Sequence, residues 1–248
     1  MAILENMPNI EIRQGDLRPW GNKWRVNNAF SKKEGMDFGT VFDNQVGKAL
    51  ATMLGGLDII CPSQTELLPK EPDVVEVGPV RIIGGIRPQN YDVGYRPDGV
   101  RFLFDSKTLN DVKSIRKNFQ NMVNDLATEA TTAHMRFPHA VVAFMVIIPD
   151  PCFVENLRSR FTRMLERLVG RCSPTDDYHK AEAVSLVLWN PVDCTIVDEW
   201  PPKNSLLRIE NFSQQIQAQY FERYDGLPPH DKPSRAQKIT LEATSQED

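Results

Sequence analysis

Hydrophobic residues recur along the chain with two different spacings, and these spacings predict its helices and strands. A spacing of three and four residues predicts amphipathic helices over residues 36–54, 110–133, 153–170 and 211–223. Short apolar or alternating runs predict strands over residues 57–61, 73–77, 80–83, 91–95, 100–104, 139–148, 183–189 and 195–200. The run over 139–148 is nearly all apolar, which is typical of a strand that is covered on both faces.

The two ends of the chain lack these patterns. Residues 1–35 interleave aromatic and basic side chains without a clear period, which predicts an irregular N-terminal arm. We favour docking of Trp20 and Trp24 onto the core, whereas for the basic residues contact with DNA and simple solvation both stay open. These basic residues are Arg13, Arg18, Lys23, Arg25, Lys32 and Lys33. Residues 228–248 are polar and rich in Pro, Ser, Glu and Asp, which predicts a disordered C-terminal tail.

The order of elements between the ends predicts one large domain over residues 36–227. A helix is followed by a group of strands, a long helix, an apolar strand, another helix and further strands. This order favours an α/β fold.

Composition and charge narrow the classes of function. The chain has 248 residues, of which 41% are hydrophobic and 25% are charged, as in ordinary soluble proteins. No apolar run reaches the roughly 18–20 residues of a membrane helix, and no secretory pattern opens the chain, so we expect a cytoplasmic protein without a membrane partner. A net charge of −4 argues against a protein that coats nucleic acid in bulk, but it is compatible with a local basic cleft.

The cysteines, histidines and glycines do not form metal-binding or nucleotide-binding motifs. The four cysteines and four histidines lack the spacing of metal ligands, so we expect free thiols and no zinc site. The glycine pairs at 55–56 and 84–85 are isolated from any phosphate-binding motif, so we expect no nucleotide cofactor.

A Pro-Asp-Gly turn over residues 97–99 separates two short apolar runs and predicts a hairpin. Folded back, this hairpin would bring Asp92 near Asp105, and Lys107 would lie on the same face as Asp105. Two close carboxylates repel each other unless a cation neutralises them, and Mg²⁺ prefers such oxygen ligands. The lysine would orient a water molecule or offset charge on a phosphate. The pattern therefore favours metal-assisted hydrolysis of a phosphodiester.

The spacing of these residues resembles that of a known family. Asp92, twelve intervening residues and then Asp105-Ser106-Lys107 at the end of an apolar strand resemble the PD-(D/E)xK nuclease superfamily, which includes most type II restriction endonucleases. The resemblance implies a restriction-endonuclease-like fold, in which a mixed β-sheet is flanked by helices on both faces. It implies Mg²⁺ held by Asp92, Asp105 and the Ser106 backbone carbonyl, and water activation by Lys107. It also implies double-stranded DNA as the substrate and a homodimer that cuts both strands.

Two acidic positions of the motif need separate comment. Asp92 follows a tyrosine, whereas the family has a proline there. Asp98 does follow a proline, but it lies in the predicted turn, six residues before the second position, so we favour Asp92. In the family an acid on a helix before the first strand commonly completes the metal site, and Asp43 resembles it. Glu34 and Asp37 are alternatives, and a solvated carboxylate is another interpretation of all three.

Two groups of basic residues follow the motif. They are Lys113, Arg116 and Lys117 at the start of the helix predicted over 110–133, and Arg160, Arg163, Arg167 and Arg171 along the helix predicted over 153–170. Both groups are candidates for contact with a DNA backbone, with solvated charge as the alternative.

The leading functional hypothesis is a Mg²⁺-dependent endonuclease of the type II restriction class that cuts a specific double-stranded DNA sequence. One alternative is a nuclease of the same fold that acts in repair, in junction resolution or as a toxin-like DNase. Another is a non-catalytic nucleic-acid-binding module, in which Asp105 and Lys107 form only a structural ion pair.

Overall fold

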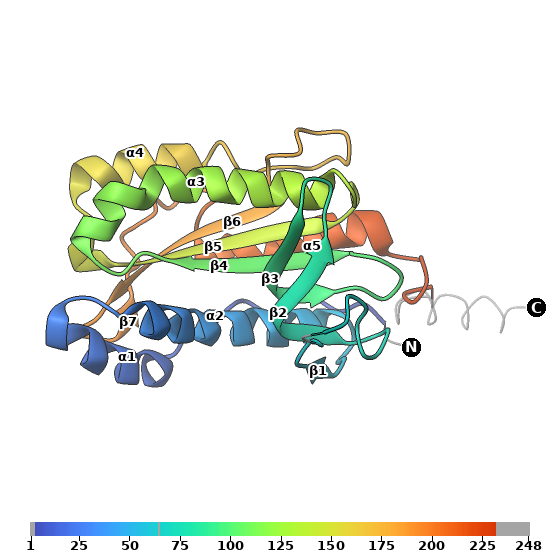
Figure 1. The fold of residues 1–248 in the computed structure, drawn as a ribbon, viewed down its shortest axis with the longest axis horizontal. Coiled ribbons are helices and arrows are strands. Elements are labelled where there is room, and N and C mark those ends of the chain that lie inside the picture. The colour runs from blue at the N-terminus through green and yellow to red at the C-terminus, as the bar shows by residue number, and fades with distance from the viewer. Residues whose placement is uncertain (1–2, 64, 232–248) are drawn as a thin grey trace, which may run out of the picture.

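The protein is built around one mixed sheet of seven strands (Figure 1). The computed structural model describes residues 3–63 and 65–231. The strands lie side by side in chain order: β1 (Ile59–Ile60), β2 (Val75–Ile83), β3 (Pro88–Tyr95), β4 (Phe102–Thr108), β5 (Val141–Pro149), β6 (Ala183–Asn190) and β7 (Thr195–Ile196). The predicted α/β class is therefore confirmed.

The direction of the strands changes across the sheet. β2, β3 and β4 form an antiparallel meander, whereas β4, β5 and β6 are parallel to one another. The two edge strands are short, with β1 parallel to β2 and β7 antiparallel to β6. Parallel neighbours need a crossover connection, and helices provide it on the way from β4 to β5 and from β5 to β6.

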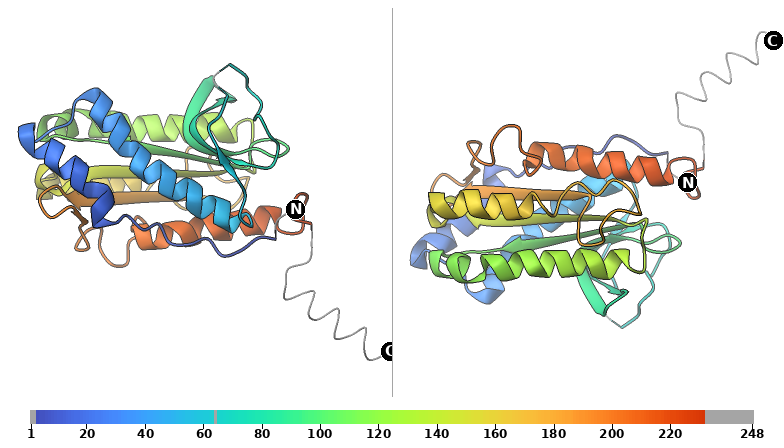
Figure 2. Two further views of the ribbon diagram at one scale, coloured as in Figure 1. Left: turned by 90° about the horizontal axis from the view of Figure 1, so that it is seen from below. Right: turned by 90° about the horizontal axis from the view of Figure 1, so that it is seen from above.

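Helices cover both faces of the sheet, as predicted (Figures 1 and 2). One face carries α1 (Gln14–Asn27), α2 (Lys32–Met53) and α5 (Ile209–Tyr224), and the other carries α3 (Val112–His134) and α4 (Glu155–Leu165). On the α5 side, the rings of Phe104 and Phe212 are 6.0 Å apart. Across the other layer, the rings of Phe119 and Phe161 are 5.9 Å apart and join α3 to α4. A short 3₁₀ helix, η1 (Asp150–Cys152), follows β5.

The core lies on both sides of β5, whose nine residues are all buried. This burial confirms the interpretation of the apolar run over 139–148 as a doubly covered strand. Such a strand removes the side chains of both faces from water, and burying one large apolar side chain contributes roughly 1.5–3 kcal/mol. The sheet is thus most firmly held at its centre, next to the strand that bears Asp105.

The N-terminal residues form a helix, so the predicted irregular arm is wrong over α1. Leu17 and Trp24 are buried, and the Trp24 indole N–H donates a hydrogen bond of 2.7 Å to the Asn110 carbonyl. Trp20 packs against Phe30, with ring centroids 5.8 Å apart. The tryptophans therefore dock α1 onto the core, as favoured from the sequence. Along the rest of this segment, Lys23 lies over the Trp20 ring, and the basic residues are exposed.

Two predicted boundaries differ from those in the structure. The strands predicted over 73–77 and 80–83 are one strand, β2, whose register shifts at Gly78 and Pro79. Pro lacks the N–H that a ladder needs, and Gly78 adopts a positive φ of 129°, so a bulge absorbs both residues. The helix predicted over 153–170 is shorter, because α4 ends at Leu165.

The C-terminal part of the described chain folds back on α5. His230 is buried, and its Nε2 lies 2.9 Å from the Tyr220 hydroxyl. The Arg101 guanidinium also donates a hydrogen bond to the Pro228 carbonyl. The predicted disordered tail is therefore wrong for residues 228–230, and the remainder of that prediction, over 232–248, lies outside the described residues. Among the described helices, none has both the length and the apolar composition that spanning a membrane requires.

Candidate active site

The candidate active site lies where β3 and β4 stop pairing. The two strands pair from Tyr95 opposite Phe102 to Val93 opposite Phe104, and the turn between them confirms the predicted hairpin. Asp92 and Asp105 are the next residues on the two strands, so they lie opposite each other where the strands separate. We call this point the β3–β4 fork. The Ser106 N–H and hydroxyl both donate to Asp92 Oδ2, at 2.8 and 3.2 Å. Asp92 thus satisfies a backbone donor that β3 no longer reaches.

Asp43 reaches the same point from α2, because small residues let that helix approach the sheet. Gly35, Gly39 and Gly47 share a spacing of four with Asp43, which places all four on one stripe of α2. A Cβ atom added to Gly39 would lie 3.1 Å from the Ser106 hydroxyl, and one added to Gly47 would lie 2.4 Å from a Val77 methyl. The backbone of α2 therefore packs directly on β2 and β4. This close packing buries the Asp43 carboxyl beside Asp92.

Lys107 enters the site from β4 and pairs with two carboxylates. Its Nζ contacts Asp105 Oδ2, on the same face of the strand, and lies 3.0 Å from Glu129 Oε1 of α3. Asp105 and Glu129 are 5% and 4% exposed, whereas the Lys107 side chain is 26% exposed. Of these three side chains, that of Lys107 is therefore the most exposed.

Burial and mutual repulsion shift the pKa values of the acids in this cluster. Burial, followed by the charge of Asp92, raises the pKa of Asp43 to about 8. Burial, followed by the charge of Asp105, raises the pKa of Asp92 to about 8. Burial raises the pKa of Asp105 to about 7, although the Lys107 charge opposes that rise. For Lys107, burial alone would lower the pKa, but Asp105 and Glu129 outweigh it and hold the pKa above its ordinary value. The cluster thus carries more potential negative charge than one lysine neutralises.

The side chains of this cluster suit a divalent cation such as Mg²⁺. Its donors are carboxylate oxygens, which hard cations prefer, and one buried oxygen, Asp43 Oδ1, has no hydrogen-bond partner among the described residues. In residues 3–63 and 65–231, no group of three or more acids, histidines or cysteines is already arranged to hold a metal ion. Lys107 already contacts Asp105 Oδ2, so an ion bound by Asp105 would compete with this ion pair.

The alternative acids lie away from the cluster. Asp98 is in the hairpin turn, where it pairs with Arg101, so Asp92 and not Asp98 lies beside Asp105. Glu34 accepts hydrogen bonds from Ser31 in the capping box of α2. Asp37 is exposed on the same helix. The sequence reasoning placed Asp43, Asp92, Asp105 and Lys107 in one site, and the structure brings those four together.

Glu129 is the member of the cluster that the sequence reasoning missed. It follows Lys107 by 22 residues and lies near the end of a long amphipathic helix, where an acid usually faces solvent. A signal was present, because Glu129 directly precedes Ala130 of the apolar stripe and its neighbours Thr132 and Ala133 are also small. This small-residue end of α3 lies against the sheet and buries Glu129.

The two predicted basic groups are exposed on α3 and in the α4 region. Lys113, Arg116 and Lys117 are exposed on the first turns of α3, shortly after the cluster in the chain. Arg160 is exposed on α4 and lies over the Phe119 ring, and Arg163 and Arg167 are exposed at and beyond the end of that helix.

Arg171 does not belong to a basic stripe. Its side chain is fully buried, and its Nη1 pairs with Glu182 at 2.7 Å. The predicted alignment of four arginines is therefore wrong, because α4 ends before Arg167 and Arg171 has a structural ion pair.

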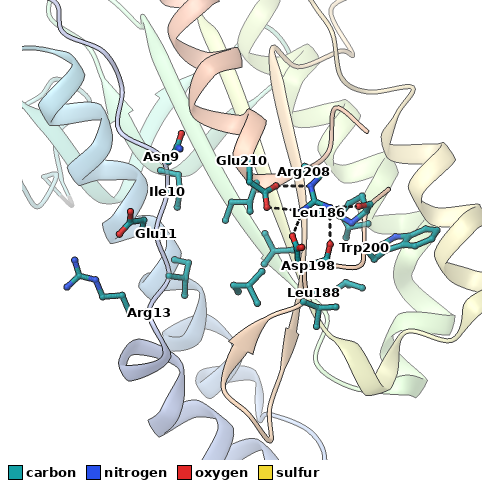
Figure 3. A pocket seen from close by; sticks show the side chains of 16 residues that line it. Asn9, Ile10, Glu11, Arg13, Leu186, Leu188, Asp198, Trp200, Arg208 and Glu210 are labelled. Carbon is teal, nitrogen blue, oxygen red and sulfur yellow. Dashed lines mark hydrogen bonds and ion pairs between the residues drawn. The ribbon is translucent and has the colours of Figure 1, made fainter. Parts of the chain in front are cut away.

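A separate pocket of about 500 Å³ lies beside β6 (Figure 3). It opens between the N-terminal segment, β6 and the chain leading into α5, and Ile10, Leu186 and Leu188 give it an apolar wall. Arg208 beside it is already engaged, since its guanidinium binds Glu210 and Asp198. The described residues of this pocket bring no group of acids to a lysine, so we place the candidate chemistry at the β3–β4 fork.

Comparisons with models of protein families, with curated proteins and with solved structures found no match to this chain. The case for a function therefore depends on the geometry of the fork.

Proposed function

We propose that the protein is a Mg²⁺-dependent DNA endonuclease that resembles type II restriction enzymes. The observation that carries this proposal is the meeting of three carboxylates and one lysine at the β3–β4 fork. Asp43, Asp92 and Asp105 come from three different elements, and each has a raised pKa that a bound cation would bring down. A purely structural ion pair needs only one acid for Lys107 and does not account for the other two.

Each side chain has a role that follows from its place. Asp92 and Asp105 would hold the cation across the fork, with Asp43 completing the site from α2 and the Ser106 backbone carbonyl as a further ligand. Bound there, Mg²⁺ would supply Lewis-acid stabilisation of the negative charge that develops on the phosphate. Lys107 is the side chain with a positive charge and access to solvent, so it would orient the attacking water and offset charge on the phosphate oxygens.

DNA contact would involve the exposed basic side chains of α3 and of the α4 region. Lys113, Arg116 and Lys117 are exposed on the first turns of α3, which suits contact with phosphates along the duplex. Arg160, Arg163 and Arg167 are exposed on the same layer and form the second proposed group. A homodimer would place two such sites on the two strands of one duplex, as the resemblance implies.

The test is digestion of supercoiled plasmid and phage DNA with the full chain, in Mg²⁺ and in EDTA. The wild type should cut in Mg²⁺ and not in EDTA. Lys107→Met and Asp105→Asn should each lose about 10²–10⁴-fold of that activity. Lys48→Met and Asp125→Asn remove exposed charges of the same kind from α2 and α3, so they serve as matched controls and should cut normally.

The pattern of products separates the outcomes. Discrete fragments with defined ends indicate restriction-type cleavage, whereas smearing or nicking of branched DNA indicates a nuclease with a repair, resolvase or toxin-like role. A folded wild type that cuts no linear, supercoiled, single-stranded or branched DNA with Mg²⁺ or Mn²⁺ contradicts the nuclease proposal. Binding of DNA without cleavage would then favour a non-catalytic module.

A further inference from the structure

Lys107 is held from two sides by acids that belong to different layers. Asp105 precedes it on β4, and Glu129 reaches it from α3 at 3.0 Å. The two acids differ in their other surroundings. Asp105 lies beside Asp92, whereas Glu129 reaches Lys107 from α3 and also lies against Asp105. Of the two acids that contact the lysine, only Asp105 belongs to the proposed set of cation ligands.

Glu129 is fixed by contacts that do not depend on Asp105. Its Oε1 also accepts a hydrogen bond of 3.2 Å from the Gln89 amide, and its backbone carbonyl accepts one of 2.8 Å from the Tyr91 hydroxyl. Both donors come from β3, so this strand and α3 hold the acid between them. The carboxylate is 4% exposed, and its Oε2 has no hydrogen-bond partner among the described residues. Because Glu129 is buried and held by these hydrogen bonds, its carboxylate can keep the ammonium group of Lys107 in place.

A cation in the fork would compete with Lys107 for Asp105. A cation bound by Asp105 would share the negative charge of that carboxylate with Lys107, so loading the site would weaken this ion pair. Without a second partner, the partly buried Lys107 side chain would be able to turn towards water, because its four-carbon stem is flexible. Glu129 supplies that partner.

We infer that Glu129 is a positioning residue, which holds Lys107 at the fork after Asp105 turns to the cation. This inference rests on the proposed function for its consequence in cleavage, but the holding of the ammonium group is a property of the chain alone. This role distinguishes Glu129 from Asp105, the other acid that contacts Lys107. Asp105 would exchange partners during loading, and Glu129 would keep the same partner throughout.

The direct test observes the Lys107 ammonium group by nuclear magnetic resonance, without DNA and without a cation. The hydrogens of a lysine ammonium group exchange with water too fast to be observed unless ion pairs protect them. The signal of Lys107 is identified by its absence from the spectrum of Lys107→Met. Asp105→Asn removes one of the two acids that pair with Lys107. Glu129 alone should then protect the ammonium group, so the Lys107 signal should persist in this variant. The signal should disappear in Asp105→Asn with Glu129→Gln, and it should persist in Asp105→Asn with Asp125→Asn, the matched control on α3.

Two results would overturn the inference. The signal would either survive in the Asp105→Asn, Glu129→Gln double variant, or already be lost in Asp105→Asn alone. Backbone amide spectra report whether the double variant is folded. Should it not fold, Glu129→Gln alone provides the same test: its Lys107 signal should disappear at saturating Mg²⁺, whereas the wild-type signal should persist.

Cleavage provides a separate measurement of the same role. Glu129→Gln should lower kcat about 10- to 100-fold while KM for DNA changes less than about twofold. In a Lys107→Met background the same substitution should change kcat less than about twofold, because Glu129 acts through the lysine. Full additivity of the two losses would contradict the inference. An inactive wild type would instead defeat the proposed function, and the ammonium measurement would still decide the role of Glu129.

Discussion

Asp92 Oδ2 accepts the Ser106 backbone N–H at 2.8 Å, at the point where β3 leaves β4. A side chain thus takes over a donor that a strand carbonyl would otherwise satisfy. The bond fixes the Asp92 carboxylate without help from a cation, whereas Asp43 Oδ1 has no partner among the described residues. One acid of the fork is therefore preorganised, and another is buried at a cost in stability.

Asp43→Asn should make the protein more stable at pH 8 than the wild type and reduce the dependence of its stability on pH. The pKa of Asp43 is raised to about 8 in the folded protein, from an ordinary value near 4. Between about pH 4 and pH 8 the folded state therefore keeps a proton that the unfolded state releases, so the free energy of unfolding falls as pH rises through this window. Its contribution to stability is fully present only below about pH 4.

Urea unfolding at pH 5 and pH 8 tests this prediction. The wild type should lose roughly 1–3 kcal/mol more than Asp43→Asn between these two pH values, after allowance for the coupling of neighbouring acids. Asp125→Asn, an exposed acid on α3, should follow the wild type. An Asp43→Asn protein that is less stable than the wild type at pH 8 would show that the carboxylate is not strained by burial.

Gly39→Val should push α2 away from β4 and weaken cation binding. The first added atom would lie 3.1 Å from the Ser106 hydroxyl, so a branched side chain has no room unless the helix moves. We expect a loss of about 1–3 kcal/mol in stability and a clear decrease in Mg²⁺ affinity by calorimetry. Gly15→Val is the matched control, since a Cβ there meets no atom within 4 Å. Unchanged Mg²⁺ affinity in Gly39→Val would remove Asp43 from the cation site.

Lys113→Gln with Lys117→Gln should lower the salt dependence of DNA binding. Each lysine that neutralises one phosphate contributes about 0.9 to the slope of log K against log salt, so the pair should reduce that slope by about 1.8. Fluorescence anisotropy in EDTA measures this without cleavage. Lys203→Gln, an exposed lysine before α5, should leave the slope unchanged.

The second basic group is tested in the same assay. Replacement of Arg160 and Arg163 by Gln should reduce the slope to a similar extent if α4 faces the duplex. An unchanged slope would assign these arginines to a solvated surface. An unchanged slope for both groups would place the DNA on another face.

Glu182→Gln should destabilise the whole domain by about 3–5 kcal/mol. Its carboxylate is fully buried and pairs with Arg171 at 2.7 Å and with Arg223 at 2.8 Å, so the neutral amide would leave two buried guanidinium groups uncompensated. Denaturant unfolding gives the change, and Glu166→Gln, on the surface, is the control. A loss below about 1 kcal/mol would show that backbone carbonyls alone satisfy these arginines.

The hairpin and the central strand could be predicted from the sequence because local signals determine them. The Pro-Asp-Gly turn and the run over 139–148 each carry a pattern that few other structures satisfy, and both were confirmed. Helix α1 was not predicted, because its buried stripe is only Leu17, Gly21 and Trp24 and its other positions are polar. A narrow stripe of this kind gives little periodic signal.

Long-range packing explains what was missed at the site. Glu129 meets Lys107 only after α3 has crossed back over the sheet, and no local pattern encodes that crossing. The contribution of α2 could be predicted in part, because Gly35, Gly39 and Gly47 lie at steps of four residues in register with Asp43. That repeat indicates a close helix–sheet contact, whereas the depth at which it buries the acid depends on Val77 and Ser106 of other strands.

The Trp24 indole donates a hydrogen bond to the Asn110 carbonyl, and Asn110 lies three residues after Lys107. A cation-induced movement of this segment would therefore change the surroundings of the indole ring and its fluorescence. Titration of the unlabelled protein with divalent cations can then be followed by intrinsic emission, with Trp24→Phe as the blank.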